Sequence, residues 1–328
     1  MSNNTRPVFR LFARRFCRLF TRDKHSHTWR RDRRHFNFFS HKNFDRVPYI
    51  IRRKADNVGL FSYFITILGG IAYADRHNMI PVVDMKNYSN PYLYPEETGR
   101  INAWEYYFTQ PGNISLENAL SCKNYILGRD TAKHVRPELL ANFLYNKRTK
   151  TYRLDYWREI CKKYIRFTPE VIARLEALKQ NYHGKRILGV LLRGTDYTTL
   201  KPSGHPIPPT AEQAIIKAQE VMKSEDFGAV YLATEDKNIL AKFQAAFNDK
   251  LILPEADYIN YDYEHARLLA DCDDINKYLR GIEYLVSMLF LAKCCKGFIT
   301  CITSGSTGVM CLSDGFDYLY VFDLGLYP

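Results

Sequence analysis

Three stretches in the second half of the chain each combine a short apolar run with a polar end. They span residues 188–197, 227–236 and 296–308. Short apolar runs of this kind are typical of strands buried in a parallel sheet. The segment 238–247, which follows the second run, has the apolar spacing of a helix. This alternation predicts an α/β fold with a mainly parallel sheet.

The first half of the chain alternates in the same way. The pattern predicts a strand at 49–52, a helix from Gly59 to about Asn78 and a second strand at 81–84. Residues 152–183 have helical apolar spacing throughout and predict one connecting helix. We therefore expect two Rossmann-like domains that face a cleft. They cover residues 47–183 and 184–328 and follow an N-terminal extension and linker at 1–46.

Arg193 follows the apolar run 188–192 directly. Ligands of open parallel sheets bind outside the carboxyl ends of the strands, so an anion would bind where Arg193 lies. The planar guanidinium can hold two phosphate oxygens at once and stays charged at any working pH. An arginine that ends a strand and pairs with Asp196 would leave the same pattern, so the residues alone leave both interpretations open.

Two further polar clusters follow predicted strands. The first consists of Thr234, Glu235 and Asp236, whose carboxylates can accept hydrogen bonds from a nucleoside. The second consists of Thr303, Ser304, Gly305, Ser306 and Thr307. Such a loop at the start of a helix presents N–H groups and hydroxyls to a phosphate, although ordinary caps and turns have the same composition. Three such clusters, one of them cationic, favour a site for a nucleoside diphosphate.

Aromatic and polar residues are interleaved over residues 87–110, a composition that suits stacking on sugar rings. We expect Glu105 and Tyr106 on the acceptor side of the site, with Glu105 as a candidate general base. A packed loop with buried rings is the alternative. The proline-rich loop 202–209 carries His205, a second candidate base, and is either a lid or an acceptor-binding segment.

The positive charge of the chain is concentrated at its start. The net charge is +12, and residues 1–46 contain thirteen Lys or Arg against three Asp or Glu, so the remainder is nearly neutral. Five apolar residues of this segment share one helical face: Phe9, Phe12, Phe16, Leu19 and Phe20. This pattern predicts a helix that binds an anionic membrane surface. A helix docked on the protein itself, a disordered arm and a transit peptide are the alternatives.

The same numbers exclude several classes of protein. A nearly neutral body argues against a nucleic-acid partner. The chain has no apolar run of about 18 residues and no secretory signal pattern, so we expect a cytoplasmic protein, peripheral on the inner face of a membrane. The eight cysteines lack zinc-site spacing and fit buried thiols in a reducing compartment. The Asp271-Cys272-Asp273 triplet is interpreted as a capping loop, so no metal is expected.

Taken in order, these motifs resemble those of the α-1,2/α-1,6/protein-O-fucosyltransferase superfamily, in the style of its family 11 and family 23 enzymes. Residues 193–197 resemble the arginine-centred first motif, 232–236 the second and 303–307 the third. The stretch 57–63, followed by residues 72–74 and 81–84, is similar to the N-terminal glycine-rich turn, helix and strand of these enzymes. The resemblance covers about residues 48–328.

The resemblance implies a GT-B-like fold and an inverting, metal-independent transfer of fucose. The donor would be GDP-fucose, no cofactor would be needed, and the acceptor would be a hydroxyl of a glycan or glycolipid in surface polysaccharide synthesis. Arg193 would stabilise the diphosphate leaving group. Asn57 and Gly59 would lie on the acceptor side. Asp196 joins the two candidate bases named above.

The first motif departs from the family pattern His-x-Arg-Arg-x-Asp at two positions. Leu191 stands where histidine is frequent, and Gly194 stands in place of the second arginine. These departures leave the donor open between GDP-fucose and another nucleotide sugar. A non-catalytic nucleotide-binding module and a basic adaptor that acts through residues 1–46 are the remaining hypotheses. A dehydrogenase is disfavoured because no Gly-x-Gly-x-x-Gly follows a predicted strand.

Overall fold

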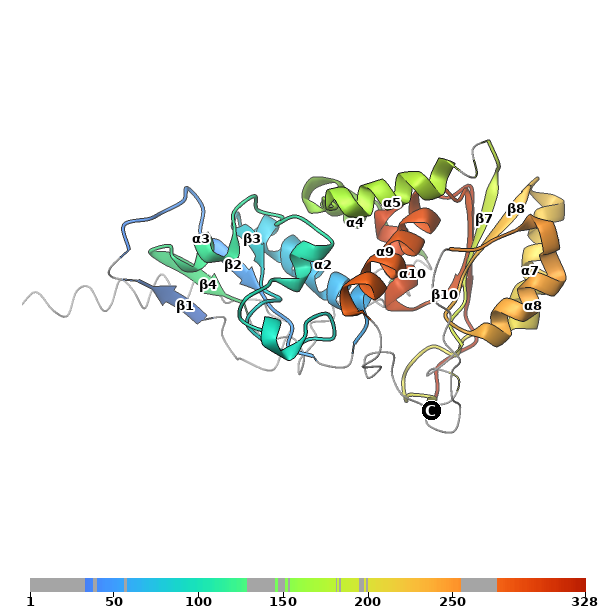
Figure 1. Ribbon diagram of the computed structural model, residues 1–328, viewed down its shortest axis with the longest axis horizontal. Helices are drawn as coiled ribbons and strands as arrows, with labels where there is room; N and C mark the ends of the chain where they lie inside the picture. Colours follow the sequence, from blue (N-terminus) through green and yellow to red (C-terminus); the bar gives the residue numbers. More distant parts are fainter. Residues whose placement is uncertain are drawn as a thin grey trace, which may run out of the picture.

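The computed structural model of the chain has two large β-sheets with a layer of helices between them (Figure 1). It describes residues 33–37, 40–55, 58–128, 145–146, 151–152, 154–180, 182, 184–194, 198, 200–254 and 276–328. The predicted amphipathic helix near the N-terminus lies outside the described residues.

The C-terminal half contains a five-stranded sheet of order β11-β10-β7-β8-β9, in which neighbouring strands are parallel. Its strands are β7 (Ile187–Leu191), β8 (Ala229–Ala233), β9 (Leu251–Ile252), β10 (Gly297–Cys301) and β11 (Tyr318–Phe322). The chain passes from β7 to β8 and β9 on one side and then returns to β10 on the other side of β7. The strand order therefore reverses between β7 and β10, as in doubly wound sheets.

Helices cover both faces of this sheet (Figure 1). They are α7 (Ala211–Ser224), α8 (Lys237–Phe247), α9 (Lys277–Lys293) and α10 (Ser304–Leu312); a single 3-10 turn, η5 (Asn248–Lys250), follows α8. Ile187 and Leu191 of β7 pack in the core with α9 and α10, whereas Leu188 and Val190 pack in the core with α7 and α8. Because side chains alternate across a strand, burial on both faces requires apolar residues at every position.

The N-terminal half contains a four-stranded sheet of order β1-β4-β2-β3. Its strands are β1 (Arg33–Phe36), β2 (Pro48–Ile51), β3 (Ile80–Val83) and β4 (Asn124–Leu127). Strand β2 is parallel to β3 and β4, and β1 is antiparallel to β4. The sheet packs against α2 (Leu60–Arg76) on one face and α3 (Leu116–Leu120) on the other. Strand β1 thus belongs to a segment that the sequence assigned to the extension and linker.

The remaining elements lie between β3 and β4 or in the segment that connects the two sheets. They are the 3-10 turns η1 (Pro95–Glu97) and η2 (Ala103–Tyr106), the strand pair β5 (Tyr145–Asn146) and β6 (Thr151–Tyr152), and helices α4 (Leu154–Tyr164) and α5 (Pro169–Gln180). The prediction of a single helix over 152–183 is wrong. Pro169 begins α5 because it has no N–H to continue α4. Helix α4 packs on α10 and α5 on α9. The domain boundary at 183/184 stays a prediction.

The two halves meet where α2 packs on α10. A Cβ atom added at Gly308 of α10 would overlap the ring of Phe61 in α2. One continuous hydrophobic core contains residues of both halves, including Phe61 of α2, Leu285 of α9 and Met310 of α10. The absence of a side chain at Gly308 therefore sets how closely the halves approach.

The last residues of the chain pair with the loop 202–209. Pro206 and Leu326 form an antiparallel bridge. The N–H of Gly204 donates to the carbonyl of Tyr327 (2.9 Å), and the N–H of Tyr327 donates to the carbonyl of His205 (2.9 Å). The predicted lid or acceptor segment is thus attached to the C-terminal tail.

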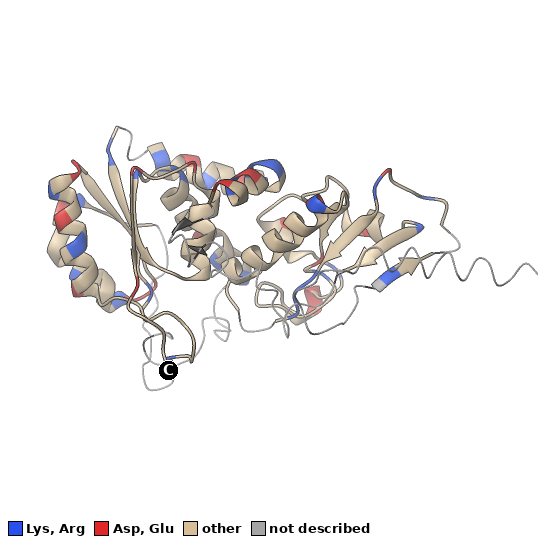
Figure 2. Ribbon diagram, turned by 180° about the vertical axis from the view of Figure 1, so that it is seen from behind, with Lys and Arg blue, Asp and Glu red and all other residues tan. Residues whose placement is uncertain are grey.

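Within the described part of the chain, every helix is too short or too polar to cross a lipid bilayer. Basic and acidic residues are interspersed over the outer helices α7 and α8 (Figure 2). Exposed ion pairs such as Lys217–Glu220 (3.0 Å) and Lys242–Glu212 (2.6 Å) belong to this surface. Pairs of this kind contribute little to stability.

We expect Gly308→Ala to lower the free energy of unfolding by about 1–3 kcal/mol, because the added methyl group overlaps Phe61. Urea unfolding followed by circular dichroism measures the change. Gly228→Ala is the matched control, since a Cβ atom added there meets nothing within 4 Å. Equal stability of the two variants would contradict close packing of α10 on α2.

Candidate active site

Arg193 lies at the carboxyl end of the five-stranded sheet, beside the point where the strand order reverses. The N–H of Leu192 donates to the carbonyl of Ala233 in β8 (3.1 Å), and the half-buried Arg193 follows. The loop 303–307 follows β10, the parallel neighbour of β7 on its other side. Since carboxyl ends of parallel strands meet at one edge, the structure brings together the three clusters that the sequence predicted.

Arg193 also lies close to the end of β10. Burial raises the pKa of the Cys301 thiol to about 11, while a main-chain hydrogen bond and the positive charge of Arg193 act to lower it. Cys301 is the last residue of β10, and only Ile302 separates it from the loop 303–307. The guanidinium charge is therefore within electrostatic reach of the strand that carries this loop.

A capping box shapes the loop 303–307. The Oγ1 of Thr303 accepts from the N–H of Ser306 (3.1 Å), and the Oγ of Ser306 accepts from the N–H of Thr303 (2.8 Å). Ser306 and Thr307 are buried, whereas Thr303 and Ser304 are half-exposed. The N–H groups of Ser304 and Gly305 are the first of α10, so the helix itself offers them no carbonyl. An anion that reaches this loop would meet those two amides.

Gly305 lets this loop approach α9 closely. An added Cβ atom would lie 2.8 Å from the hydroxyl of Tyr284 and 3.5 Å from Leu191 Cδ2. The ring of Tyr284 in turn packs edge-on against Phe61 of α2, with ring centroids 5.7 Å apart. Tyr284 therefore links the loop to the N-terminal half. Leu191, at the position where the related motif has histidine, contributes an apolar wall here.

Within the cluster 234–236, Asp236 has a structural role. Asp236 is 4% exposed and caps α8, where its Oδ1 accepts from the N–H of Asn238 (2.8 Å). The N–H of Asp236 donates to Thr234 Oγ1 (3.2 Å). A side chain at Gly194 would overlap Asp236 Oδ2. Glu235 is half-exposed, and the nucleoside contacts of all three residues stay predictions.

Tyr92 of the N-terminal half lies within electrostatic range of charged residues at this sheet edge. Burial raises the pKa of its hydroxyl, on which the charges of Arg280, Glu235 and Arg193 act in that order of strength. The main-chain amide of Leu60 also hydrogen-bonds to this hydroxyl. Charged side chains that follow β7 and β8, and one from α9, thus act on one buried tyrosine of the opposite half.

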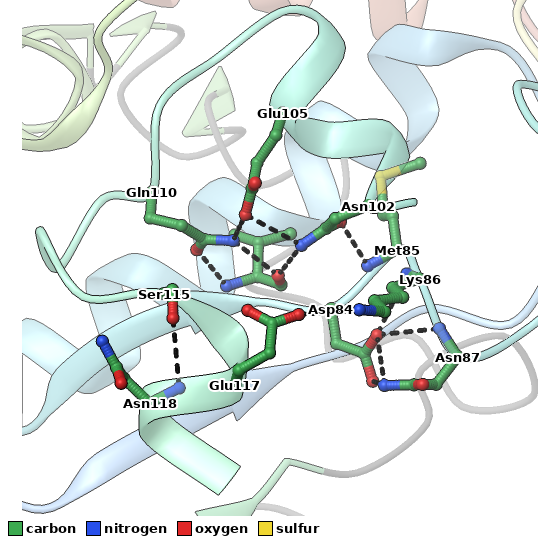
Figure 3. A network of polar contacts seen from close by, with 11 residues as sticks. Asp84, Met85, Lys86, Asn87, Asn102, Glu105, Gln110, Ser115, Glu117 and Asn118 are labelled. Carbon is green, nitrogen blue, oxygen red and sulfur yellow. Dashed lines mark hydrogen bonds and ion pairs between the residues drawn. The ribbon is translucent and has the colours of Figure 1, made fainter. Parts of the chain in front are cut away.

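Three buried amide side chains, which we call the amide frame (Asn90, Asn102 and Gln110), hold the segment that carries Tyr92. Asn102 Nδ2 and Gln110 Nε2 both donate to the carbonyl of Val83 at the end of β3 (2.9 and 3.0 Å), as Figure 3 shows for this region. The N–H of Tyr92 donates to Asn90 Oδ1 (3.1 Å). These bonds replace the sheet hydrogen bonds that end with β3.

Glu105 and Tyr106 lie beside the amide frame. Glu105 is exposed, and its Oε1 accepts from Gln110 Nε2 (2.7 Å) and Asn102 Nδ2 (3.3 Å) (Figure 3). The Tyr106 hydroxyl donates to Glu97 Oε1 (3.3 Å). Burial and the neighbouring Glu97 raise the pKa of Tyr106 to about 12, so its hydroxyl stays protonated at neutral pH. The acceptor-side roles of Glu105 and Tyr106 stay predictions.

The other predicted residues are more scattered. Gly59 is exposed directly before α2, and His205 is exposed in the loop attached to the C-terminal tail. Asn57, Asp196 and the triplet 271–273 lie outside the described residues. Within the residues that are described, no three His, Cys, Asp or Glu side chains gather as metal ligands.

Sequence reasoning missed Tyr92, Arg280 and Tyr284 as residues of this site. A signal exists for two of them. Arg280 and Tyr284 are four residues apart in α9, whose later part is almost entirely apolar, so they share one face near its start. Tyr92 was only one of many aromatic residues in the stretch 87–110.

No protein-family model matches the chain, and no curated protein matches its sequence. Solved structures match its fold. NodZ α-1,6-fucosyltransferase soaked with GDP-fucose has a TM-score of 0.50 and 16% identity over 85% of this chain and 96% of that chain. Selenomethionine NodZ from Bradyrhizobium has the same TM-score and identity over 86% and 96%. POFUT1 in complex with GDP is less similar, with a TM-score of 0.47 and 10% identity over 84% and 98%. The expected GT-B-like fold is thereby confirmed: the chain has the fold of the NodZ fucosyltransferase structures.

Proposed function

We propose that the chain is a glycosyltransferase that transfers fucose from GDP-fucose to a hydroxyl group of a glycan acceptor. The observation that carries this proposal is the place of Arg193, at the reversal of strand order, beside the start of α10 and in electrostatic contact with Tyr92 of the other half. The likeness in fold to a NodZ α-1,6-fucosyltransferase soaked with GDP-fucose supports the choice of donor.

The diphosphate would bind at the start of α10. The amides of Ser304 and Gly305, together with the positive end of the helix dipole, would hold its oxygens. Arg193 would pair with the same group. Negative charge on the diphosphate grows as the bond to the sugar breaks, so these groups stabilise the transition state more than the bound donor and thereby raise the rate.

The acceptor hydroxyl would attack the anomeric carbon from the opposite face, which inverts its configuration in one displacement without a metal ion. The acceptor would lie towards Gly59 and Tyr106, and Glu235 would contact the nucleoside. A base takes the proton of the acceptor hydroxyl, with Glu105, Asp196 and His205 as the candidates.

The first test is calorimetric titration of the full chain with GDP, UDP and GDP-fucose. We expect GDP and GDP-fucose to bind and Arg193→Ala to weaken GDP binding by about 10²-fold, because a charge-assisted contact to the diphosphate is lost. Arg174→Ala, which removes an exposed arginine paired with Glu170 on α5, is the control and should bind GDP normally.

Turnover is then measured as release of GDP from GDP-fucose, with and without glycan acceptors. Preferential binding of UDP would indicate a UDP-sugar as the donor, and the proposed reaction would still be glycosyl transfer. Binding of GDP without turnover on any acceptor would favour a nucleotide-binding module. A folded chain that binds no nucleotide would contradict the proposal.

The part played by the loop 303–307 is tested separately. Gly305→Ala brings a methyl group against the Tyr284 hydroxyl, so it should displace the loop and weaken GDP binding by about 10-fold. The double variant, Gly305→Ala with Tyr284→Phe, lacks this hydroxyl and should regain most of the affinity for GDP. Tyr284→Phe alone is the control. Unchanged GDP affinity in Gly305→Ala would show that the loop does not hold the phosphates.

We also propose that residues 1–46 hold the enzyme on an anionic membrane surface in the cytoplasm, where it would serve surface glycan synthesis. Because β1 begins at Arg33, the test variant should lack residues 1–32 only. We expect the full chain to sediment with vesicles that contain phosphatidylserine and the shortened chain to stay in solution. Vesicles of phosphatidylcholine alone are the control. Equal sedimentation of both chains would contradict a membrane role of this segment.

A further inference from the structure

We propose that Arg280 of α9 is a second cationic ligand of the donor diphosphate and acts together with Arg193. The inference rests on the proposed function and deepens it, since it assigns a binding residue that the three sequence motifs do not contain. It comes from the position of α9 between the loop 303–307 and the N-terminal half.

Contacts on both sides of Arg280 fix its place. One turn later on the same face of α9, the Tyr284 hydroxyl lies 2.8 Å from the position that a Cβ atom of Gly305 would take. At the next residue, a Cβ atom added to Gly281 would overlap the Tyr107 hydroxyl of the N-terminal half. Arg280 is therefore within one helical turn of Tyr284, the residue of α9 that contacts the loop 303–307.

The start of α9 is also held on the N-terminal half. The ammonium group of Lys277 donates to the carbonyl of Leu93 (3.2 Å) and lies 5.1 Å from the ring centroid of Tyr94. Tyr278 packs edge-on against Tyr106, with ring centroids 5.1 Å apart. These contacts pre-position the backbone of Arg280, so little order would have to be gained when the donor binds.

The charges around Tyr92 suit a diphosphate. Arg280 acts on the buried Tyr92 hydroxyl more strongly than Glu235 or Arg193 does, and it also acts on Tyr107. Two guanidinium groups, those of Arg280 and Arg193, are thus among the charges that act on one buried hydroxyl. A diphosphate carries more negative charge than a monophosphate and gains more from a second guanidinium.

Position 194 cannot supply this second cation. A Cβ atom added at Gly194 would overlap Asp236 Oδ2 and lie 2.8 Å from Ile239 Cδ1. Asp236 cannot move away freely, because it is buried and caps α8. An arginine directly after Arg193 would thus require Asp236 or Ile239 to shift, whereas Arg280 brings a guanidinium towards the same edge from a different element.

Binding of GDP and GMP to the full chain tests the inference. We expect Arg280→Ala to weaken GDP binding by about 10- to 100-fold, the range for a lost hydrogen bond to a charged group, and to weaken GMP binding much less. The preference for GDP over GMP should therefore fall. Arg280→Lys keeps the charge but not the planar fork, so its affinity should lie between those of the wild type and Arg280→Ala. Arg174→Ala is again the control.

The ratio of the two affinities separates ligand contact from structural support. If Arg280 only stabilised the junction, for instance through Glu235, its loss would weaken GDP and GMP equally and lower the melting temperature, which would overturn the inference. Wild-type GDP affinity in Arg280→Ala, with loss of binding in Arg193→Ala, would overturn it while the proposed function stands. If the wild type bound no nucleoside diphosphate, the result would contradict both the inference on Arg280 and the proposed function. Should Arg280→Ala not fold, an unchanged GDP preference in Arg280→Lys would also overturn the inference.

Discussion

The contact between α2 and α10 determines where the other parts of the candidate site lie. Gly308 allows the ring of Phe61 to pack directly on the backbone of α10. Because α10 begins one helical turn earlier, at Ser304, this contact also fixes the loop 303–307 relative to the N-terminal half. Tyr284 packs against both Phe61 and Gly305, so the same packing carries α9 with it. The edge of the C-terminal sheet that carries the candidate site is thus positioned by α2, a helix that covers the N-terminal sheet.

Buried polar side chains supply hydrogen bonds to main-chain groups, which apolar packing cannot do. The amide frame satisfies main-chain groups of Val83, the last residue of β3, which is an edge strand of its sheet. An apolar residue at Asn102 would remove one of the two amide donors to the carbonyl of Val83 and the side-chain acceptor of the Met85 N–H. A fully satisfied polar network favours one loop conformation over its alternatives. Tyr92 is therefore presented to the charged residues in a single position.

The sequence predicted the parts of this fold whose pattern is local. Apolar runs with polar ends marked β7, β8 and β10, because burial on both faces leaves few choices of residue. Strand β1 escaped prediction because its Arg-Arg-His-Phe sequence has no apolar pattern and depends on pairing with β4, far away in the chain. The break between α4 and α5 had a local signal in Pro169, which the helical spacing on both sides concealed.

For the candidate site, the strand ends could be predicted but the arrangement of side chains could not. Arg193 follows from its place after a strand, whereas Arg280 and Tyr92 come to this edge only through the packing of the two halves. The tasks of Asp236 and Ser306 as caps likewise depend on backbone geometry that composition does not reveal.

The packing of Gly194 on Asp236 has a consequence for how such a chain can change over generations. An arginine at position 194 would be damaging while Asp236 is present, and loss of Asp236 would first remove the cap of α8. Neither single step is favourable, although the pair together could be tolerated. The two positions are therefore coupled, and the effect of a substitution at 194 depends on the residue at 236.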